Sequence, residues 1–189
     1  LKYAKDELNK AILEHGIDSI TFVIGENGLD LAKKFDLLCP IIKVGNWIGP
    51  LLVQAATQKV KKIILLGYYG KLIKLAGGIF YTHNHLADAR IEILVYIAIK
   101  QKIPLKIINS FMKSQTIDDA IKIVEAFNID VAKKLIYEIS NHIEIRSIEY
   151  IQKYIDSDIK VGVIVFDRDR KIRAISNSSQ KMFSKIFTL

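Results

Sequence analysis

Two lysines that follow a glycine are the first candidates for chemistry in this sequence. Lys71 directly follows Gly70, and Lys74 lies three residues further on, so a helix that begins at Gly70 would place both on one face of its first turn. The helix dipole disfavours cations there, and a bound carboxylate or phosphate would relieve the conflict. The segment is not a Walker A loop, because Leu72 stands where that loop requires Ser or Thr. Two interpretations stay open, an anion-binding turn and two ordinary surface lysines.

Residues 82–92 carry a dense set of charged side chains at the start of an apolar segment. Asp88, Arg90 and Glu92 fall in the first turns of a predicted helix over residues 86–100. The other positions of this helix are mainly apolar, so we expect it to be buried. Buried charges have to be paired or to contact a ligand. The segment therefore predicts either an Asp88–Arg90 pair at a helix start or a ligand site.

Two histidines in the same segment have a spacing that metal sites use. His83 and His85 are separated by one residue, and the sequence otherwise offers only His15, His142 and the single cysteine Cys39. A protein zinc site usually needs three or four side-chain ligands. We therefore predict no metal site.

A glycine-rich turn follows the first predicted strand. Gly25, Glu26, Asn27 and Gly28 stand where a backbone can approach a nucleoside or phosphate closely, and Glu26 could accept hydrogen bonds from ribose hydroxyls. The same glycines also suit a turn that binds nothing, because a tight strand-to-helix turn needs positive φ. Both interpretations are kept.

The elements that must position these residues repeat a strand, a glycine-bearing loop and a helix three times. This order is typical of a parallel sheet with crossover helices, so we predict a Rossmann-like α/β fold with a mostly parallel sheet flanked by helices. Since the carboxyl ends of such strands meet at one edge, the loops with Gly25, Gly49 and Gly70 should converge. The predicted strands are residues 19–24, 41–44 and 63–66, and the helices are residues 29–35, residues 50–58 with Pro50 at the first position, and a segment from Lys71.

The remaining segments complete a single α/β domain over residues 1–189. Thr116 and Asp119 have the spacing of a capping box, which predicts a helix start. The other expected elements are a helix over residues 2–15 ending at Gly16, a strand over residues 105–108, three helices from Thr116 to about residue 154, and a C-terminal β-hairpin of residues 159–166 and 171–176.

Charge and composition limit the class of partner. The chain has 189 residues, of which 50% are hydrophobic, and a net charge of +8, which favours a folded domain with polyanionic ligands. Nucleic acid is not predicted, because the lysines form neither a like-charge block nor a basic stripe interleaved with aromatics. No uncharged apolar run is long enough to span a membrane, and a single cysteine fits a reducing compartment. We therefore expect a cytoplasmic location.

Four segments have the order and composition of motifs from one known family. In the third and fourth, glycine-bracketed lysines are followed by Thr-His and then by Ala-Asp-Ala-Arg, a specific combination. The segments are residues 25–28, 45–49, 67–78 and 82–90. Together they resemble the cobalt-precorrin-5B C(1)-methyltransferase family of anaerobic cobalamin biosynthesis. That family usually has His where this chain has Tyr68 and Ser where it has Asn84.

The resemblance implies transfer of a methyl group from S-adenosylmethionine to C1 of a cobalt-containing tetrapyrrole, which gives cobalt-precorrin-6A. The carboxylate rim of such a macrocycle suits cationic side chains. The implied cofactor-binding residues are Gly25, Glu26, Gly28, Asn46 and Gly49. The implied substrate-binding residues are Gly70, Lys71, Lys74, Thr82 and Arg90, and the catalytic residues, for orientation or proton transfer, are His83 and Asp88.

The resemblance is to the C-terminal half of that family, whose members also have an N-terminal domain with a Gly-Tyr-Thr-Thr-Gly type motif. We expect that motif and domain to be absent here, so the partner is either such a domain or a second copy of the chain. The alternative function is a non-catalytic tetrapyrrole-binding or assembly domain, which Tyr68 also favours. A third candidate is a nucleotide-binding α/β protein whose lysine loop binds phosphate.

Overall fold

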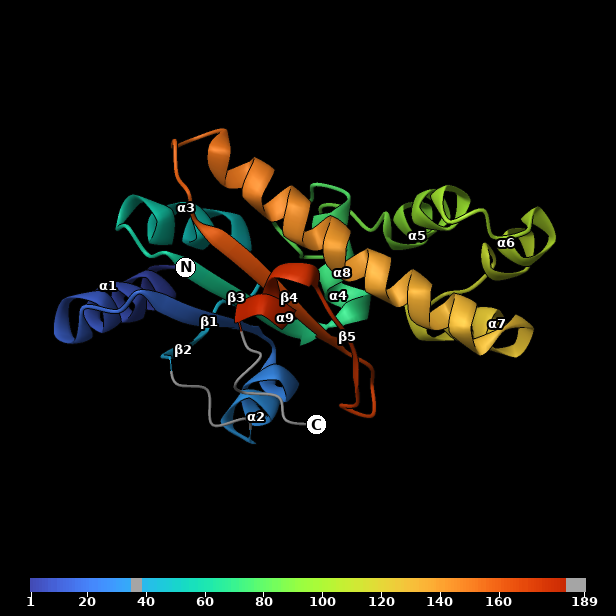
Figure 1. Ribbon diagram of the computed structural model, residues 1–189, viewed down its shortest axis with the longest axis horizontal. Coiled ribbons are helices and arrows are strands. Elements are labelled where there is room, and N and C mark those ends of the chain that lie inside the picture. Colours follow the sequence, from blue (N-terminus) through green and yellow to red (C-terminus); the bar gives the residue numbers. More distant parts are fainter. Residues whose placement is uncertain (35–38, 183–189) are drawn as a thin grey trace.

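A five-stranded sheet forms the centre of the computed structural model, which describes residues 1–34 and 39–182 (Figure 1). The strand order is β2-β1-β3-β4-β5. The first four strands in this order are parallel, and β5 pairs antiparallel with β4. The strands are β1 (Ser19–Ile24), β2 (Ile41–Lys43), β3 (Lys62–Tyr68), β4 (Lys160–Phe166) and β5 (Ile172–Ile175).

The central strands are apolar on both sides because helices cover both faces of the sheet. Side chains alternate between the faces along each strand, so each row of paired residues belongs to one layer of the core. One row, Phe22, Leu65 and Val163, packs in the larger cluster. The next row, Val23, Leu66 and Ile164, packs in the smaller cluster on the other face.

The helices form two covering layers and an arm. Helices α3, α4 and α8 cover the face of the larger cluster, and α2 and α9 lie on the other face. Helices α5, α6 and α7, here called the helical arm, lie to one side of the sheet (Figure 1). The N-terminal part of α8 extends beyond the sheet and packs against the arm. None of the helices in the described residues is long and apolar enough to cross a membrane. The helices are α1 (Lys2–His15), α2 (Glu26–Lys34), α3 (Ile48–Thr57), α4 (Tyr69–Ala76), α5 (Arg90–Lys100), α6 (Leu105–Phe111), α7 (Ile117–Phe127), α8 (Ile129–Gln152) and α9 (Asn177–Met182).

The predicted parallel α/β organisation is confirmed. Helix α1 ends at Gly16, which adopts the left-handed conformation at φ 54°. Thr116 caps α7, since its side chain accepts a hydrogen bond from the backbone N–H of Asp119 at 3.2 Å. The C-terminal hairpin is present, and its first strand also continues the parallel sheet through its pairing with β3.

Several predicted boundaries are wrong. Residues 105–108 form the start of α6 and not a strand, because Pro104 occupies the N-cap and Ile108 and Phe111 place one helical face in the core. The three helices expected up to residue 154 are two, α7 and the 24-residue α8. Helix α2 begins at Glu26, earlier than expected, and Phe35, its predicted end, lies outside the described residues.

Two predicted helix starts are also corrected. Pro50 is the third residue of α3 and not the first, because α3 begins at Ile48. Helix α5 begins at Arg90, so Asp88 precedes the helix. Nor is α5 buried all round, since Tyr96 and Ile99 are more than half exposed on the face that the arm turns to solvent.

The strand order creates a topological switch point between β1 and β3. After β1 the chain enters α2 on one face, and after β3 it enters α4 on the opposite face. The two connections diverge, which leaves a crevice at the carboxyl ends of these neighbouring strands. Open α/β sheets bind their ligands at such crevices.

Candidate functional site

Two cavities lie next to each other at the carboxyl ends of the parallel strands, and they share Tyr68 and Lys71. The strand-end cavity, of about 350 Å³, is formed mainly by residues 24–27 at the end of β1 and residues 166–168 at the end of β4. The loop cavity, of about 420 Å³, is formed by the 82–85 loop with Asn46, Gly70 and Arg90. Both volumes fall in the range of small-molecule sites.

The structure brings most of the predicted site residues to these two cavities. Gly25 and Glu26 line the strand-end cavity, and Lys71 lines both. The loop cavity contains Asn46, Gly70, Thr82, His83 and Arg90. The strand-end loops with Gly25 and Gly70 thus converge as expected.

Four predicted residues line neither cavity. Gly28 lies inside α2, where its backbone packs near Val23. Gly49, in the first turn of α3, packs so tightly that a Cβ there would lie 2.7 Å from the Tyr150 hydroxyl. Lys74 is fully buried, and Asp88 faces another cavity in the helical arm.

Asn46 fixes the start of the 82–88 loop. The backbone N–H of Thr82 donates to the Asn46 carbonyl at 3.1 Å, and the Thr82 hydroxyl donates to Asn46 Oδ1 at 3.1 Å. Beside them Trp47 and Tyr81 form an isolated antiparallel bridge, with ring centroids 4.3 Å apart. The loop after β2 therefore holds one wall of the loop cavity.

Lys74 holds the 82–88 loop in place through hydrogen bonds. Its ammonium group donates three hydrogen bonds, to the carbonyl of Thr82 at 3.2 Å, to Asn84 Oδ1 at 2.6 Å and to the carbonyl of Ala87 at 2.7 Å. Burial lowers the pKa of Lys74, while the Asp88 carboxylate acts in the opposite direction. An ammonium group has three donors, so in this arrangement all three are used by the protein.

Lys71 has the opposite surroundings. The side chain is half-buried and lines both cavities, yet it makes no hydrogen bond or ion pair with any residue in 1–34 or 39–182. Burial, and then the nearby Lys74 ammonium, lower the pKa of Lys71. A half-buried cation without a partner is costly, and an anion between the two cavities would compensate it.

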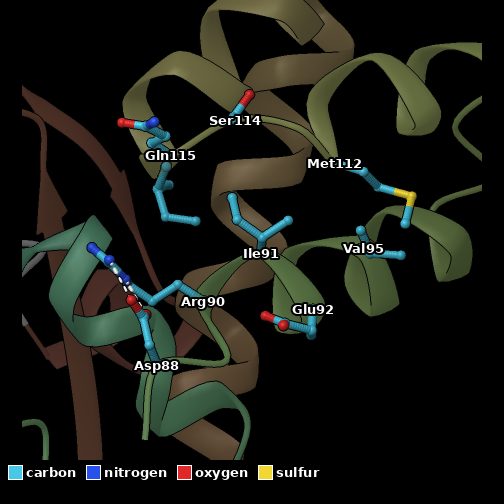
Figure 2. A pocket seen from close by; sticks show the side chains of 9 residues that line it. Asp88, Arg90, Ile91, Glu92, Val95, Met112, Ser114 and Gln115 are labelled. Carbon is cyan, nitrogen blue, oxygen red and sulfur yellow. Dashed lines mark hydrogen bonds and ion pairs between the residues drawn. The ribbon is translucent and has the colours of Figure 1, made fainter. Parts of the chain in front are cut away.

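Arg90 stands between the loop cavity and the arm cavity, a space of about 550 Å³ beside α5 (Figure 2). Its guanidinium binds Asp88 in a bidentate way, with Nη2 donating to Oδ2 at 2.6 Å. This hydrogen bonding lowers the pKa of Asp88. The rest of the arm cavity is of mixed character, with Val95 and Met112 among its apolar lining residues and Glu92 and Gln115 among its polar ones.

The two histidines pair with each other. The rings of His83 and His85 stack with centroids 4.9 Å apart, and the backbone N–H of His85 donates to His83 Nδ1 at 3.3 Å. Within the described parts of the chain, no group of three or more His, Cys, Asp or Glu side chains could hold a metal ion. His83 lines the loop cavity as a potential hydrogen-bonding or proton-transfer group.

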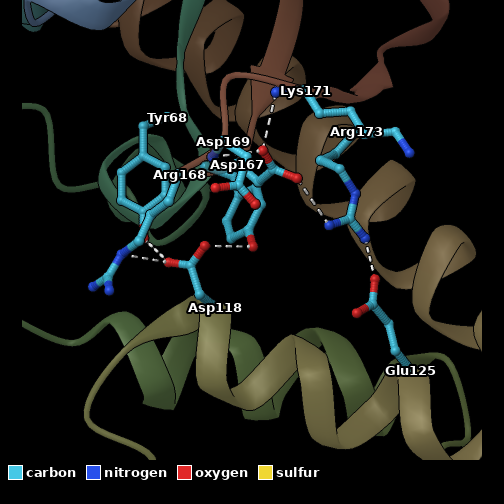
Figure 3. A network of polar contacts seen from close by, with 9 residues as sticks. Tyr68, Asp118, Glu125, Asp167, Arg168, Asp169, Lys171 and Arg173 are labelled. Carbon is cyan, nitrogen blue, oxygen red and sulfur yellow. Dashed lines mark hydrogen bonds and ion pairs between the residues drawn. The ribbon is translucent and has the colours of Figure 1, made fainter.

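A polar network that the sequence does not predict surrounds Asp118 (Figure 3). This carboxylate, 7% exposed at the start of α7, accepts hydrogen bonds from the hydroxyls of Tyr68 and Tyr69 and is paired with Arg168 Nε at 3.2 Å. The capping pattern of Thr116 predicts the helix start but gives no signal for the tyrosines, which lie 50 and 49 residues away. Only the packing of α7 against the start of α4 brings them together.

Gly70 leaves room for the Tyr68 ring. A Cβ at Gly70 would lie 2.6 Å from the Tyr68 hydroxyl oxygen. We expect Gly70→Ala to displace the ring from Asp118 and to lower the free energy of unfolding by about 1–3 kcal/mol, measured by urea denaturation. Gly28→Ala in α2 is the control, because its Cβ would make only ordinary van der Waals contacts with the neighbouring strands. Equal stability of the Gly70→Ala variant and the native chain would contradict this packing.

Comparison with known proteins identifies the family. A family model described as "CbiD, C-terminal domain" matches residues 81–177, which include the 82–88 loop, the helical arm, α8, β4 and β5. The chain belongs to the CbiD family. The matched segment holds Arg90 and Asp118, while the strand-end cavity also uses β1, which precedes it.

Curated relatives of this CbiD chain are named cobalt-precorrin-5B C(1)-methyltransferase. The relative from Prochlorococcus marinus subsp. pastoris is 57% identical over 97% of this chain and 50% of its own length. Those from the strains MIT 9515 and MIT 9312 are 55% and 50% identical, over 92% and 97% of this chain. The chain spans about half the length of these relatives. No solved structure matches it significantly.

Proposed function

We propose that this chain carries the ligand-binding sheet edge of a cobalt-precorrin-5B C(1)-methyltransferase, where S-adenosylmethionine and a cobalt-containing tetrapyrrole meet. The observation that carries the proposal is Lys71, a half-buried ammonium without a partner in the described residues, at the boundary of two cavities. Two adjacent cavities suit a group transfer between two ligands. The names of the relatives supply the identity of the reaction.

The strand-end cavity is the proposed site of the methyl donor. It lies at the switch point, and Gly25 adopts φ 84° there with open space around it, so the backbone can approach a ligand. Glu26 offers a carboxylate for ribose hydroxyls and is held by an ion pair with Lys43. When bound, S-adenosylmethionine supplies an electrophilic methyl group on a sulfonium.

The loop cavity is the proposed site of the tetrapyrrole edge that receives the methyl group. Lys71 and Arg90 provide positive charge for the acetate and propionate side chains of the macrocycle. Asp88 orients Arg90 through its two hydrogen bonds, and His83 is available for orientation or proton transfer. Lys74 contributes indirectly, because it holds the 82–88 loop.

The chain's part in the reaction is chiefly to position the two ligands. Methyl transfer requires the acceptor carbon close to the methyl group and in line with the departing sulfur, and correct placement alone can supply a large share of the rate. Lys71 belongs to both cavities. Its ammonium can therefore hold a substrate carboxylate at the border where the methyl group has to cross.

Calorimetric titration of the chain with S-adenosylhomocysteine and with cobyrinic acid, a corrinoid that keeps its carboxylates, tests this proposal. We expect binding of each ligand alone and of both together. Binding of both without methyl transfer to the natural substrate would favour the alternative of a non-catalytic tetrapyrrole-binding domain. Binding of neither ligand would contradict the proposal.

Binding of cobyrinic acid should also depend on pH through Lys71. The ammonium form attracts carboxylates, and the pKa of Lys71 in the free chain lies below the ordinary lysine value of 10.5. A bound anion raises that pKa. Affinity should therefore stay constant near neutral pH and fall as pH rises through the lowered pKa of the free chain. Lys71→Arg, which stays charged, should remove this fall, and an unchanged pH profile in that variant would contradict the assignment.

A further inference from the structure

We propose that Asp118 is a positioning residue that holds the Tyr68 ring as the common wall of the two cavities. This inference rests on the proposed function, because the wall matters only if both cavities hold ligands. Nothing in the family match or in the names of the relatives assigns a role to this aspartate.

Three separate segments meet at the Asp118 carboxylate. One oxygen accepts the hydrogen bond from Tyr69 at 3.0 Å, and the other contacts the Tyr68 hydroxyl and Arg168 Nε. Asp118 comes from the helical arm, the tyrosines from the junction of β3 and α4, and Arg168 from the turn after β4. Figure 3 shows the Asp118 side chain at the start of α7, pointing toward Tyr68 and Arg168. The arm is thereby tied to the edge of the sheet.

The Tyr68 ring is constrained from two sides. Its hydroxyl is bound to Asp118, and the missing side chain of Gly70 gives the ring tip the space it occupies. The ring itself lines both the strand-end cavity and the loop cavity. A shift of this ring would therefore change the shape of both cavities at once.

The charges around the ring keep the wall neutral. Burial, and then the hydrogen bond to Asp118, raise the pKa of Tyr68 to about 12, so the phenol stays protonated near neutral pH. Arg168 compensates the Asp118 carboxylate. The hydroxyl of Tyr68 is thus used for anchoring, and the ring offers an uncharged surface for a flat ligand in the cavity that Lys71 and Arg90 also line.

Tyr69 provides a matched control. It also donates its hydroxyl to Asp118, but it is 1% exposed and lines neither of the two cavities. Tyr68→Phe and Tyr69→Phe therefore remove the same group from the same carboxylate. If Asp118 acts only in stability, the buried Tyr69 should matter at least as much as Tyr68. If it acts through the wall, only the loss at Tyr68 should affect ligands.

The experiment compares Asp118→Asn, Tyr68→Phe and Tyr69→Phe in calorimetric titrations with S-adenosylhomocysteine and cobyrinic acid, with thermal melts of each variant. We expect Asp118→Asn and Tyr68→Phe to weaken both ligands by about fivefold, equivalent to about 1 kcal/mol, and Tyr69→Phe by less than about twofold while it melts earlier. Equal losses for the two tyrosine variants, or native affinity in Asp118→Asn, would overturn the positioning role.

A measurement on the unmutated chain covers the case in which a variant fails to fold. With ring-labelled tyrosine, the NMR signals of Tyr68 should shift when either ligand is added, and those of Tyr69 should stay in place. If both ligands bind and the Tyr68 signals respond to neither, the wall is refuted while the proposed function stands. If neither ligand binds the native chain, the proposed function fails and this inference fails with it.

Discussion

Replacing Lys71 with methionine is expected to weaken binding of cobyrinic acid by about tenfold or more, because a charge-assisted hydrogen bond contributes about 1.5–3 kcal/mol. The thermal stability should change little, since Lys71 has no partner in the described residues whose hydrogen bonds would be lost. Titration calorimetry near neutral pH measures the affinity, and a thermal melt measures the stability.

Two controls separate a local contact from a general charge effect. Lys106→Met removes the same charge from an exposed position on α6 and should leave the affinity nearly unchanged. In cobyrinic acid that is fully methyl-esterified, no carboxylate remains to bind the lysine. Lys71→Met should therefore not weaken binding of this ester. An equal loss of affinity in both lysine variants would show that only the net charge of the chain attracts the ligand.

Lys74→Met is expected to act first on the fold. Removal of this buried ammonium leaves the carbonyls of Thr82 and Ala87 and the side chain of Asn84 without their donor. Unsatisfied buried polar groups are expensive, so the free energy of unfolding should fall by about 2–4 kcal/mol. Urea denaturation of the variant beside the native chain measures this loss.

The Lys71→Met variant is the matched control for stability, because it changes the same residue type on the same helix. A second signature separates the two lysines: amide hydrogen exchange across residues 82–88 should speed up in Lys74→Met and stay unchanged in Lys71→Met. If Lys74→Met keeps native stability but selectively loses binding of cobyrinic acid, Lys74 contacts the substrate directly. That is the substrate-binding role that the family resemblance implied.

Much of the fold could be predicted from local pattern. Buried parallel strands are continuous apolar runs. The predicted bounds of β1 are therefore correct at both ends, and those of β2 and β3 are within two residues. Side-chain caps such as Thr116 give equally local signals. The strand predicted for residues 105–108 is wrong because a short apolar run fits a strand or a helix equally well. Only the contacts of Ile108 and Phe111 with the core decide for the helix.

For the candidate site, the sequence by itself determined which loops meet. Parallel strands bring their carboxyl ends to one edge, so the convergence of the loops with Gly25 and Gly70 follows from chain order. The loop after β2 reaches the same edge through Asn46, whereas Gly49, predicted to converge there, packs against Tyr150. Only the tertiary structure decided what each side chain does there. Lys71 and Lys74 look alike in sequence, yet one turns toward the cavities and the other is enclosed by its own loop. Burial and hydrogen-bond partners depend on residues distant in the chain, and for that reason Asp118 left no local signal.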